Sequence, residues 1–282
     1  MKRLLLLLLV PALLAAFTLT SDTSYSKGPP AKVLPEYMAL GDSLGVGVGA
    51  SDPATKGYVP RFRDFLQSNQ GLGTDVFLNN LSVSGAKSSD LLEKKGQLSQ
   101  AVKELKQRNG DKKPGNDVEV VTVNIGGNDV FALVPVLLAE PACALGPTLA
   151  CLTAIAPVIG GTFATFEDNF DSILGQLRTA AGPDTPIIVM TYYNPLLPPC
   201  PLAPLAAFGD IVLEGLPGLE PFGLGPLDGL NDRIEAIAAT HGAGVADTFG
   251  ELSASDLVGD CLHANDDGYG SIAAKFKAAF KD

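Results

Sequence analysis

The alternation of strand-like apolar runs with helical patterns is the feature of this sequence that most limits its fold. Residues 118–124 (VEVVTVN) and 186–192 (PIIVMTY) are rich in β-branched and other apolar side chains. Such runs are typical of strands covered on both faces, as in a parallel sheet. Segments with apolar residues at helical spacing separate them. The sequence therefore predicts a doubly wound α/β domain with a mostly parallel sheet.

The expected elements follow one another along residues 36–282, which we interpret as one domain. Of the 282 residues, 46% are hydrophobic, which is enough for one substantial core. Strands are expected at 37–40, 75–83, 118–124, 186–192 and 243–247, and helices at 59–67, 88–92, 98–108, 163–181, 227–240 and 268–280.

Two apolar segments interrupt this pattern, near residues 130–166 and 194–227. Glu140 is the only charged residue of the first, and the second carries eight prolines and three acidic residues. Both follow expected strand ends, where open α/β sheets bind their ligands. We expect them to form the walls of an apolar substrate pocket. The alternative is that they only pack on the scaffold or on each other.

The N-terminal residues 1–21 have the pattern of a secretory signal peptide. Lys2 and Arg3 precede a long uncharged apolar stretch, and a Ser-, Gly- and Pro-rich segment at 22–35 follows as a flexible linker. An uncleaved membrane anchor is the alternative, but the stretch is short and Pro11 interrupts it. We therefore expect a secreted or extracytoplasmic protein. The cleavage site is not defined by the sequence.

The four cysteines, Cys143, Cys151, Cys200 and Cys261, agree with an exported protein that carries two disulfides. Four cysteines allow three pairings. Cys143 and Cys151 share one short segment, which favours their pairing and leaves Cys200 for Cys261. A zinc site is not indicated, because the sequence has no C-x-x-C pair and only two His.

Ser43 is a candidate nucleophile, since it lies in Gly41-Asp42-Ser43-Leu44 directly after the first expected strand. The unpaired amides of a helix start there can bind an anion. A nucleophilic Ser needs a base. His241 is expected at a helix C-terminus, where the helix dipole favours it. His263 lies in a loop before the last helix, and Asp260, three residues earlier, can fix its tautomer.

Four sequence blocks in this order resemble the conserved blocks of the GDSL/SGNH hydrolases. They are Gly41-Asp42-Ser43-Leu44, Gly85 in SVSGAKSSDLL, Gly126-Gly127-Asn128-Asp129, and Asp260 with His263. The resemblance spans about residues 37–280. It implies a flavodoxin-like three-layer α/β/α sandwich with about five parallel strands, the SGNH hydrolase fold.

The resemblance also implies the role of each residue. Ser43 would be the nucleophile and His263 the general base, with Asp260 orienting the imidazole. The backbone N–H groups of Ser43 and Gly85 and the side-chain amide of Asn128 would form the oxyanion hole. Gly85 suits this role because it has no Cβ, and Asn128 because its amide offers two donors.

A dinucleotide site is the competing enzyme hypothesis, because Gly45-Val46-Gly47-Val48-Gly49-Ala50 fits G-x-G-x-x-A. That motif calls for an acidic residue at the end of the second strand, and the residues there, Asn79 and Asn80, are not acidic. We therefore expect no cofactor and no metal, and we interpret the glycines as making a flexible loop.

The sequence thus predicts a secreted serine esterase or lipase that acts on a small-molecule or lipid ester, most plausibly a fatty-acyl ester. The alternatives are a carbohydrate deacetylase of the same fold and a non-catalytic lipid-binding envelope protein. A transient contact with a lipid interface is compatible with this interpretation, and no obligate protein partner is inferred. The net charge of −11 argues against a nucleic-acid partner.

Overall fold

A sheet of five parallel strands organises the molecule. The computed structural model describes residues 34–216 and 227–281. The strand order is β2-β1-β3-β4-β5, and the register runs parallel throughout. The strands are β1 (Glu36–Gly41), β2 (Phe77–Asn80), β3 (Val118–Asn124), β4 (Ile187–Met190) and β5 (Gly244–Ala246). The predicted α/β fold class is confirmed.

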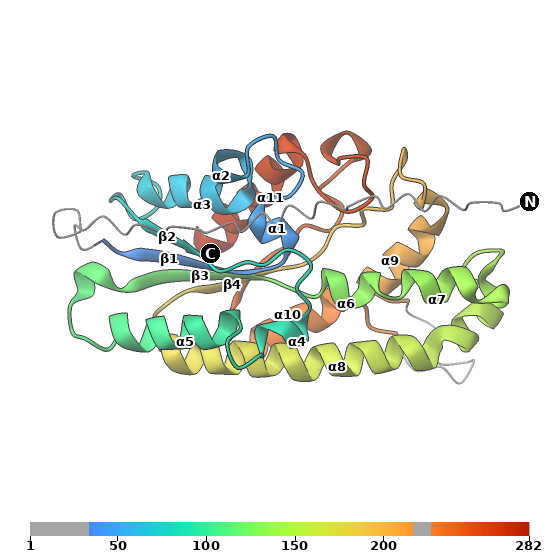
Figure 1. Cartoon of the computed structure of the whole chain (residues 1–282), viewed down its shortest axis with the longest axis horizontal. Coiled ribbons are helices and arrows are strands. Elements are labelled where there is room, and N and C mark those ends of the chain that lie inside the picture. The colour runs from blue at the N-terminus through green and yellow to red at the C-terminus, as the bar shows by residue number, and fades with distance from the viewer. Residues whose placement is uncertain (1–33, 217–226, 282) are drawn as a thin grey trace, which may run out of the picture. The chain divides into compact units, whose positions relative to one another are not determined.

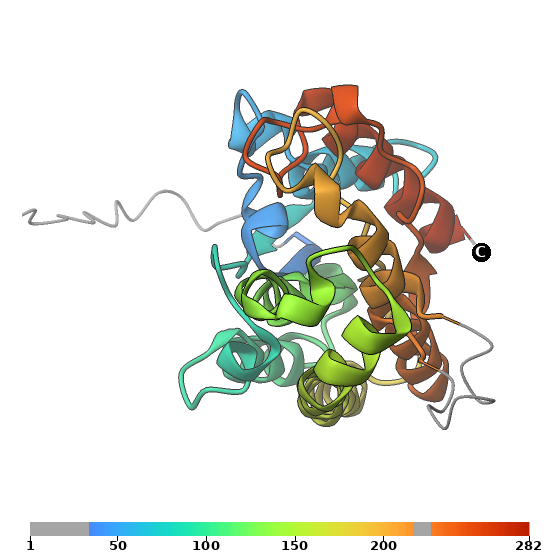
Figure 2. The ribbon, with the colours of Figure 1, turned by 90° about the vertical axis from the view of Figure 1, so that its right-hand side faces the viewer.

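Helices cover both faces of this sheet. Figure 1 shows α1, α2, α3 and α11 above it and α4, α5, α8 and α10 below it, and the end view of Figure 2 shows the same layers. The helices are α1 (Ser43–Val46), α2 (Pro53–Lys56), α3 (Tyr58–Gln67), α4 (Ser88–Leu91), α5 (Gln97–Arg108), α6 (Gly127–Phe131), α7 (Val134–Ala139), α8 (Leu149–Ala181), α9 (Ala206–Glu214), α10 (Leu230–Thr240) and α11 (Asp266–Lys281). The expected three-layer sandwich is therefore present.

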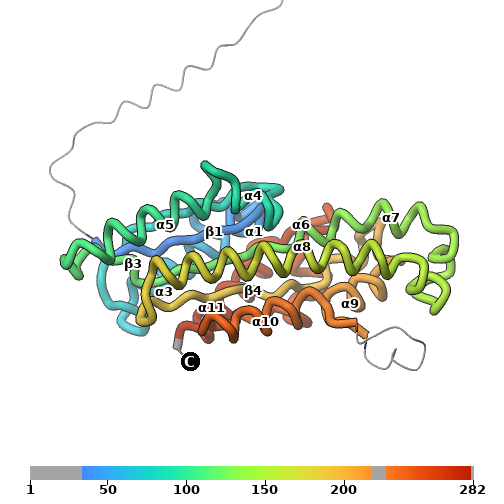
Figure 3. The backbone as a smooth tube through the Cα atoms, turned by 90° about the horizontal axis from the view of Figure 1, so that it is seen from below, coloured from blue at the N-terminus to red at the C-terminus, as the bar shows by residue number. Residues whose placement is uncertain are grey.

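Helix α8 differs most from the sequence prediction. It begins at Leu149, not at residue 163, and contains Pro157 in its interior. Proline costs an interior helix hydrogen bond, but apolar side chains from Leu152 to Leu177 are buried along one side of α8, and this packing keeps the helix continuous. Figure 3 shows α8 running between α5 and α10.

The same helix meets the length and hydropathy criteria for a membrane span. It is the one helix among the described residues that does so, with a mean hydropathy of 1.8 in its most apolar window, of which 33% is buried. A core helix of a soluble protein meets the same criteria. Along one side, α8 contributes Ile155, Phe166 and Leu177 to the hydrophobic core.

The strand ends on one edge of the sheet lie close together. In the register of β1 and β3, Gly41 is paired with Asn124, the last residue of each strand. The loops after all five strands therefore begin at this edge, as the parallel arrangement requires. The predicted nucleophile and amide blocks come directly after β1 and β3, in α1 and α6, and the histidine block lies in the segment after β5.

Two disulfides cross-link the loops, Cys143–Cys151 and Cys200–Cys261, which is the pairing that the sequence favoured. They agree with an oxidising compartment. The predicted signal peptide at 1–21 and most of the linker at 22–35 lie outside the described residues, so both stay predictions.

Candidate active site

Ser43 is the first residue of α1, directly after β1. Asp42 caps this short helix, and its carboxylate accepts a hydrogen bond from the Leu44 N–H at 2.9 Å. The backbone N–H of Ser43 has no hydrogen-bond partner among residues 34–216 and 227–281. A free N–H at a helix start is suited to a developing negative charge.

The three predicted catalytic side chains meet in one hydrogen-bonded chain. The Ser43 Oγ lies 2.8 Å from Nε2 of His263. The other ring nitrogen, Nδ1, lies 2.5 Å from Oδ2 of Asp260. The sequence separates Ser43 from His263 by 220 positions, so only the fold brings them together. A hydroxyl, an imidazole and a carboxylate in this order can carry out acyl transfer.

The loop that carries His263 is held by several contacts. Oδ1 of Asp260 accepts hydrogen bonds from the backbone N–H groups of Leu262 and His263, both at 3.0 Å. The Tyr193 hydroxyl donates to the Leu262 carbonyl at 2.8 Å. Cys261 has φ 65°, a left-handed conformation that residues with a Cβ rarely adopt. The disulfide to Cys200 joins this turn to the segment after β4.

The charge state of Asp260 suits a partner of histidine. Partial burial alone would raise the pKa of Asp260, but hydrogen bonds from the His263 side chain and from the backbone of His263 and Leu262 together outweigh it. The pKa of Asp260 therefore lies below its ordinary value. The carboxylate stays ionised at neutral pH and can stabilise an imidazolium.

The two other predicted oxyanion donors belong to adjoining loops. The Asn128 amide donates to the Ala86 carbonyl at 2.9 Å, which ties the loop after β3 to the turn at Gly85. One hydrogen of the Asn128 amide remains for another acceptor. Gly85 has φ 81° and its N–H has no partner within the described residues. Asn128 lines the pocket described below, whereas Gly85 is not one of the lining residues.

A buried polar network that sequence reasoning missed lies beneath Ser43. The Asp42 carboxylate accepts from the Asn124 amide at 2.6 Å and from the Tyr192 hydroxyl at 2.9 Å. The Tyr58 hydroxyl in turn donates to Asn124 at 2.6 Å. The network joins the ends of β1, β3 and β4. The only sequence signal was that polar residues follow these strands directly.

Asp42 is the charged member of this network. Burial raises its pKa to about 6, although hydrogen bonds from Leu44, Tyr192 and Asn124 act in the opposite direction. Asp42 therefore carries a charge at neutral pH at a cost to stability. That cost is consistent with a role in fixing the turn that holds Ser43.

The glycine-rich run after Ser43 serves close packing, which corrects the expectation of a flexible loop. A Cβ on Gly45 would lie 2.2 Å from the Ser82 hydroxyl oxygen. Gly49 has φ 95°, and a Cβ there would lie 2.5 Å from the Ala264 carbonyl oxygen and 3.0 Å from the His263 Cβ. The run thus allows the Ser43 and His263 loops to approach each other.

Several polar side chains near helix ends have partners far away in the sequence. Asp129 is in the first turn of α6, but its carboxylate accepts from the backbone N–H and hydroxyl of Ser88, at 2.9 and 2.6 Å. Asp266 likewise accepts from Ser51 across the site. His241 ends α10 as predicted, with Nε2 2.8 Å from Asp171. None of these groups contacts Ser43.

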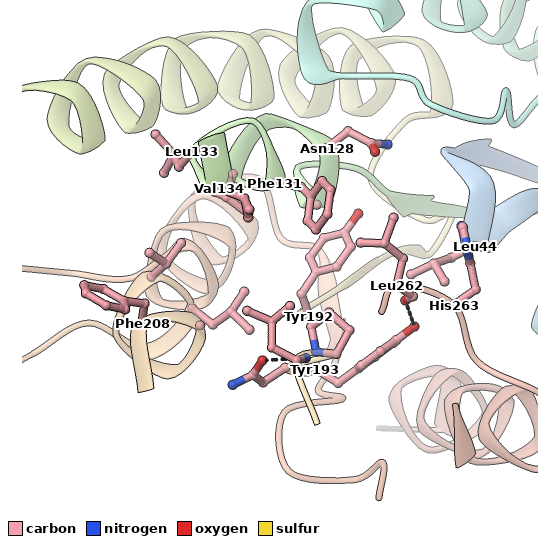
Figure 4. A pocket seen from close by; sticks show the side chains of 18 of the residues that line it. Leu44, Asn128, Phe131, Leu133, Val134, Tyr192, Tyr193, Phe208, Leu262 and His263 are labelled. Carbon is pink, nitrogen blue, oxygen red and sulfur yellow. Dashed lines mark hydrogen bonds between the residues drawn. The ribbon is translucent and has the colours of Figure 1, made fainter. Parts of the chain in front are cut away.

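Ser43 and His263 open into an apolar pocket of about 820 Å³, a volume that includes its open mouth. Figure 4 shows Phe131 and Val134 on one side of it, Phe208 on another, and Tyr192 and Tyr193 on the side nearer to His263. The wall from the first apolar segment is Val130, Phe131, Leu133, Val134 and Leu137, and that from the second is Asn194, Pro195, Leu196, Phe208, Gly209, Val212 and Leu213. Both segments thus line one pocket.

The described residues contain no group of three or more His, Cys, Asp or Glu side chains placed to hold a metal ion. The start of the Ser43 helix adjoins the apolar pocket. The G-x-G-x-x-A run, which could have indicated a dinucleotide site, is packed against His263 and Ser82.

The chain is similar in fold to solved structures of esterases and hydrolases. The crystal structure of an acetylxylan esterase from Geobacillus stearothermophilus has 16% sequence identity to this chain and a TM-score of 0.50, and the match covers 89% of this chain and 97% of that one. An alpha/beta hydrolase enzyme from the metagenome of Lake Arreo, Spain, has 18% identity and a TM-score of 0.48, with 88% and 95% covered. No curated protein sequence matches the chain.

A family model places the chain more firmly than these distant structural matches. The model of the GDSL-like Lipase/Acylhydrolase family matches residues 39–270, which is most of the chain. The matched range includes Ser43, Asn128, Asp260 and His263. The chain therefore belongs to the GDSL-like lipase/acylhydrolase family and is a carboxylic ester hydrolase.

Proposed function

We propose that the protein is a secreted serine hydrolase that cleaves fatty-acyl or other lipid esters through an acyl-enzyme on Ser43. The observation that carries the proposal is the chain Asp260–His263–Ser43, with heavy-atom distances of 2.5 and 2.8 Å, at the mouth of an apolar pocket. The single domain spans residues 36–282 in this proposal. Residues 1–21 direct export.

The mechanism follows from the geometry. Ser43 Oγ attacks the ester carbonyl while Nε2 of His263 takes its proton, and the ionised Asp260 stabilises the resulting imidazolium at Nδ1. The carbonyl oxygen becomes an oxyanion, which the N–H groups of Ser43 and Gly85 and the Asn128 amide stabilise. His263 then protonates the leaving alcohol. Water, deprotonated by His263, hydrolyses the acyl-enzyme and releases the acid.

The apolar pocket walls support a fatty-acyl substrate. A long acyl chain gains free energy for each methylene that leaves water, about 0.8 kcal/mol. The solved esterase with the same fold acts on acetylxylan, so deacetylation of a carbohydrate is the second candidate. A series of p-nitrophenyl esters from acetate to palmitate separates the two. We expect kcat/KM to rise with chain length, and a maximum at acetate would contradict the lipid proposal.

Covalent labelling tests the acyl-enzyme directly. A fluorophosphonate probe should label the wild-type protein at Ser43 and leave the Ser43→Ala variant unlabelled. Circular dichroism of the variant is the control for its folding. Ester hydrolysis should fall about 10⁴-fold or more in that variant, as for nucleophile removal in other serine hydrolases. Labelling that persists in Ser43→Ala, or lipid binding without any labelling of the wild type, would refute the proposed mechanism.

A further inference from the structure

Exposed large hydrophobic side chains gather on one short stretch of the chain. Among the described residues, seven such side chains are exposed, and all but Phe77 and Val83 lie between α7 and the first part of α8. Leu145 is 91% exposed and Leu138 64%. We name this group the apolar tip; its members are Val136, Leu138, Leu145, Leu149 and Val158. A concentration of this kind on a soluble domain marks an interaction site.

The fold holds the apolar tip in place. The disulfide Cys143–Cys151 closes the loop that carries Leu145 and Leu149. The Thr148 side chain caps α8 by accepting from the Cys151 N–H at 3.2 Å. Figures 1 and 3 both show α7 and the start of α8 together at one end of the molecule. The cross-linked loop therefore holds Leu145 and Leu149 exposed to solvent.

The charge distribution around the tip selects among partners. Residues 130–166 contain no Lys or Arg, and their one acid, Glu140, accepts a hydrogen bond from the Ala142 N–H. The whole chain carries a net charge of −11. An anionic membrane surface would therefore repel the protein, and residues 130–166 supply no Lys or Arg to offset that repulsion. The same charge disfavours a second copy of the chain. A neutral or zwitterionic lipid surface carries no net charge and does not repel the protein electrostatically.

The tip is continuous with the pocket through α7. Leu133, Val134 and Leu137 of this region line the pocket, while Val136 and Leu138, from the same turns, are exposed. A partner that covers the exposed side of α7 thus lies next to the side of α7 that lines the pocket, where an acyl chain would bind. A lipid surface is the partner whose own molecules also fit an apolar pocket beside Ser43.

We propose that the apolar tip inserts into a neutral or zwitterionic lipid surface and that ester substrates pass from this surface into the pocket. Interfacial binding of this kind scales with the apolar area buried in the lipid. The role of the surface as a source of substrate rests on the proposed lipid-ester function. Binding itself does not.

The experiment measures co-sedimentation with vesicles of phosphatidylcholine and, separately, of phosphatidylglycerol. All proteins carry Ser43→Ala so that the lipid is not hydrolysed, and all carry the same N-terminal residues. The test variant combines Leu138→Ser, Leu145→Ser and Leu149→Ser. The matched control is Phe77→Ser, which is 51% exposed at the start of β2, the strand end away from the pocket. A Leu145→Ser single variant gives a milder change at the most exposed position.

We expect the parent to bind phosphatidylcholine vesicles at least tenfold more tightly than the triple variant, with Leu145→Ser between them and Phe77→Ser equal to the parent. Equal binding by parent and triple variant, no binding by the parent, or binding only to phosphatidylglycerol would overturn the proposal. A lipid-free dimer that the triple variant loses would assign the tip to a second copy instead.

Activity separates this proposal from the proposed function. With Ser43 restored, the triple variant should hydrolyse soluble p-nitrophenyl butyrate within twofold of the wild type and an emulsified triglyceride at least tenfold more slowly. If neither the wild type nor the triple variant hydrolyses the soluble ester, the proposed function fails. The vesicle experiment still tests whether the apolar tip binds lipid. Equal rates on the emulsion would contradict delivery of substrate through the tip.

Discussion

The polar groups around Ser43 and His263, which we call the polar site, and the apolar walls of the pocket are built in opposite ways. Both carboxylates of the polar site have specific partners: Asp42 beneath Ser43 accepts three hydrogen bonds, and Asp260 in the His263 loop accepts three. The walls from α6, α7 and α9 are almost entirely apolar side chains that share one cavity. Hydrogen bonds fix atoms to a few tenths of an ångström, whereas apolar contact is non-directional. The first region should therefore set the reaction and the second the substrate.

Variants should separate the two regions by how their effects depend on acyl length. Changes in the polar site should lower the rate for every ester alike, because they act on the reacting atoms. Changes in the walls should alter the ratio between long and short esters.

The largest effect that tests this contrast is expected from Asn128→Ala. Removal of one oxyanion donor costs about 10²–10³ in kcat in other enzymes. The loss should be equal within a factor of about three for acetate and for decanoate esters. Steady-state kinetics of p-nitrophenyl esters provide the measurement. A loss confined to the long ester would place Asn128 in the substrate wall and not in the oxyanion hole.

A smaller and length-dependent effect is expected from Val134→Asp, which puts a carboxylate into the half-buried pocket wall of α7. An unpaired charge beside an acyl chain is costly, so kcat/KM for decanoate should fall about tenfold or more while that for acetate stays within about threefold. Ala132→Asp is the control, since Ala132 is exposed and does not line the pocket. An equal fall in kcat/KM for both esters would contradict the inference that the pocket wall sets the preference for acyl length.

The two disulfides make a further test, because Cys200–Cys261 holds the His263 loop and Cys143–Cys151 closes the loop of the apolar tip, outside the pocket lining. Loss of Cys200–Cys261 by double Ser substitution should free the turn at Cys261 and lower kcat several-fold for all esters before the fold melts. Loss of Cys143–Cys151 should leave acetate hydrolysis unchanged and weaken activity on emulsified substrate. Kinetics and thermal melts of both double variants test this. Full kcat in the first variant would show that Cys261 does not support the His263 loop.

The smallest effect concerns stability. The pKa of Asp42 is raised from 3.8 to about 6 in the folded state, so the folded protein binds a proton between these pH values that the unfolded chain does not. The contribution of the protonated Asp42 side chain to the free energy of unfolding is thus fully present below about pH 4 and is lost as pH rises through about 6. Asp42→Asn removes this pH-dependent loss of stability, because an amide does not ionise. The hydrogen bonds can be kept, since the amide oxygen can accept from Leu44 and Asn124 while the amide nitrogen donates to Tyr192.

We therefore expect Asp42→Asn to unfold at higher urea concentration than the wild type at pH 8, by about 3 kcal/mol at most, with the difference shrinking toward pH 4. Urea titrations at the two pH values measure it. A difference that grows at acid pH would contradict a raised pKa at Asp42.

The sequence alone determined the class of the fold and the residues proposed to react. The strand at 118–124 was predicted to the residue, because β-branched apolar runs report burial on both faces directly. Ser43, Asp260 and His263 could be proposed because the sequence blocks that contain them resemble those of the GDSL/SGNH hydrolases, and because the chain has only two His that could act as the base.

Tertiary structure decided what depends on contacts between distant residues. Packing on the sheet carries α8 through Pro157, which local propensity alone would place at a helix boundary. The link from Asp42 to Asn124 and Tyr192, the tight approach at Gly49 and the joint pocket of the two apolar segments all join residues far apart in the chain. Hydrogen bonds and cavities of this kind exist only once strand order and register are set, and no local pattern records them.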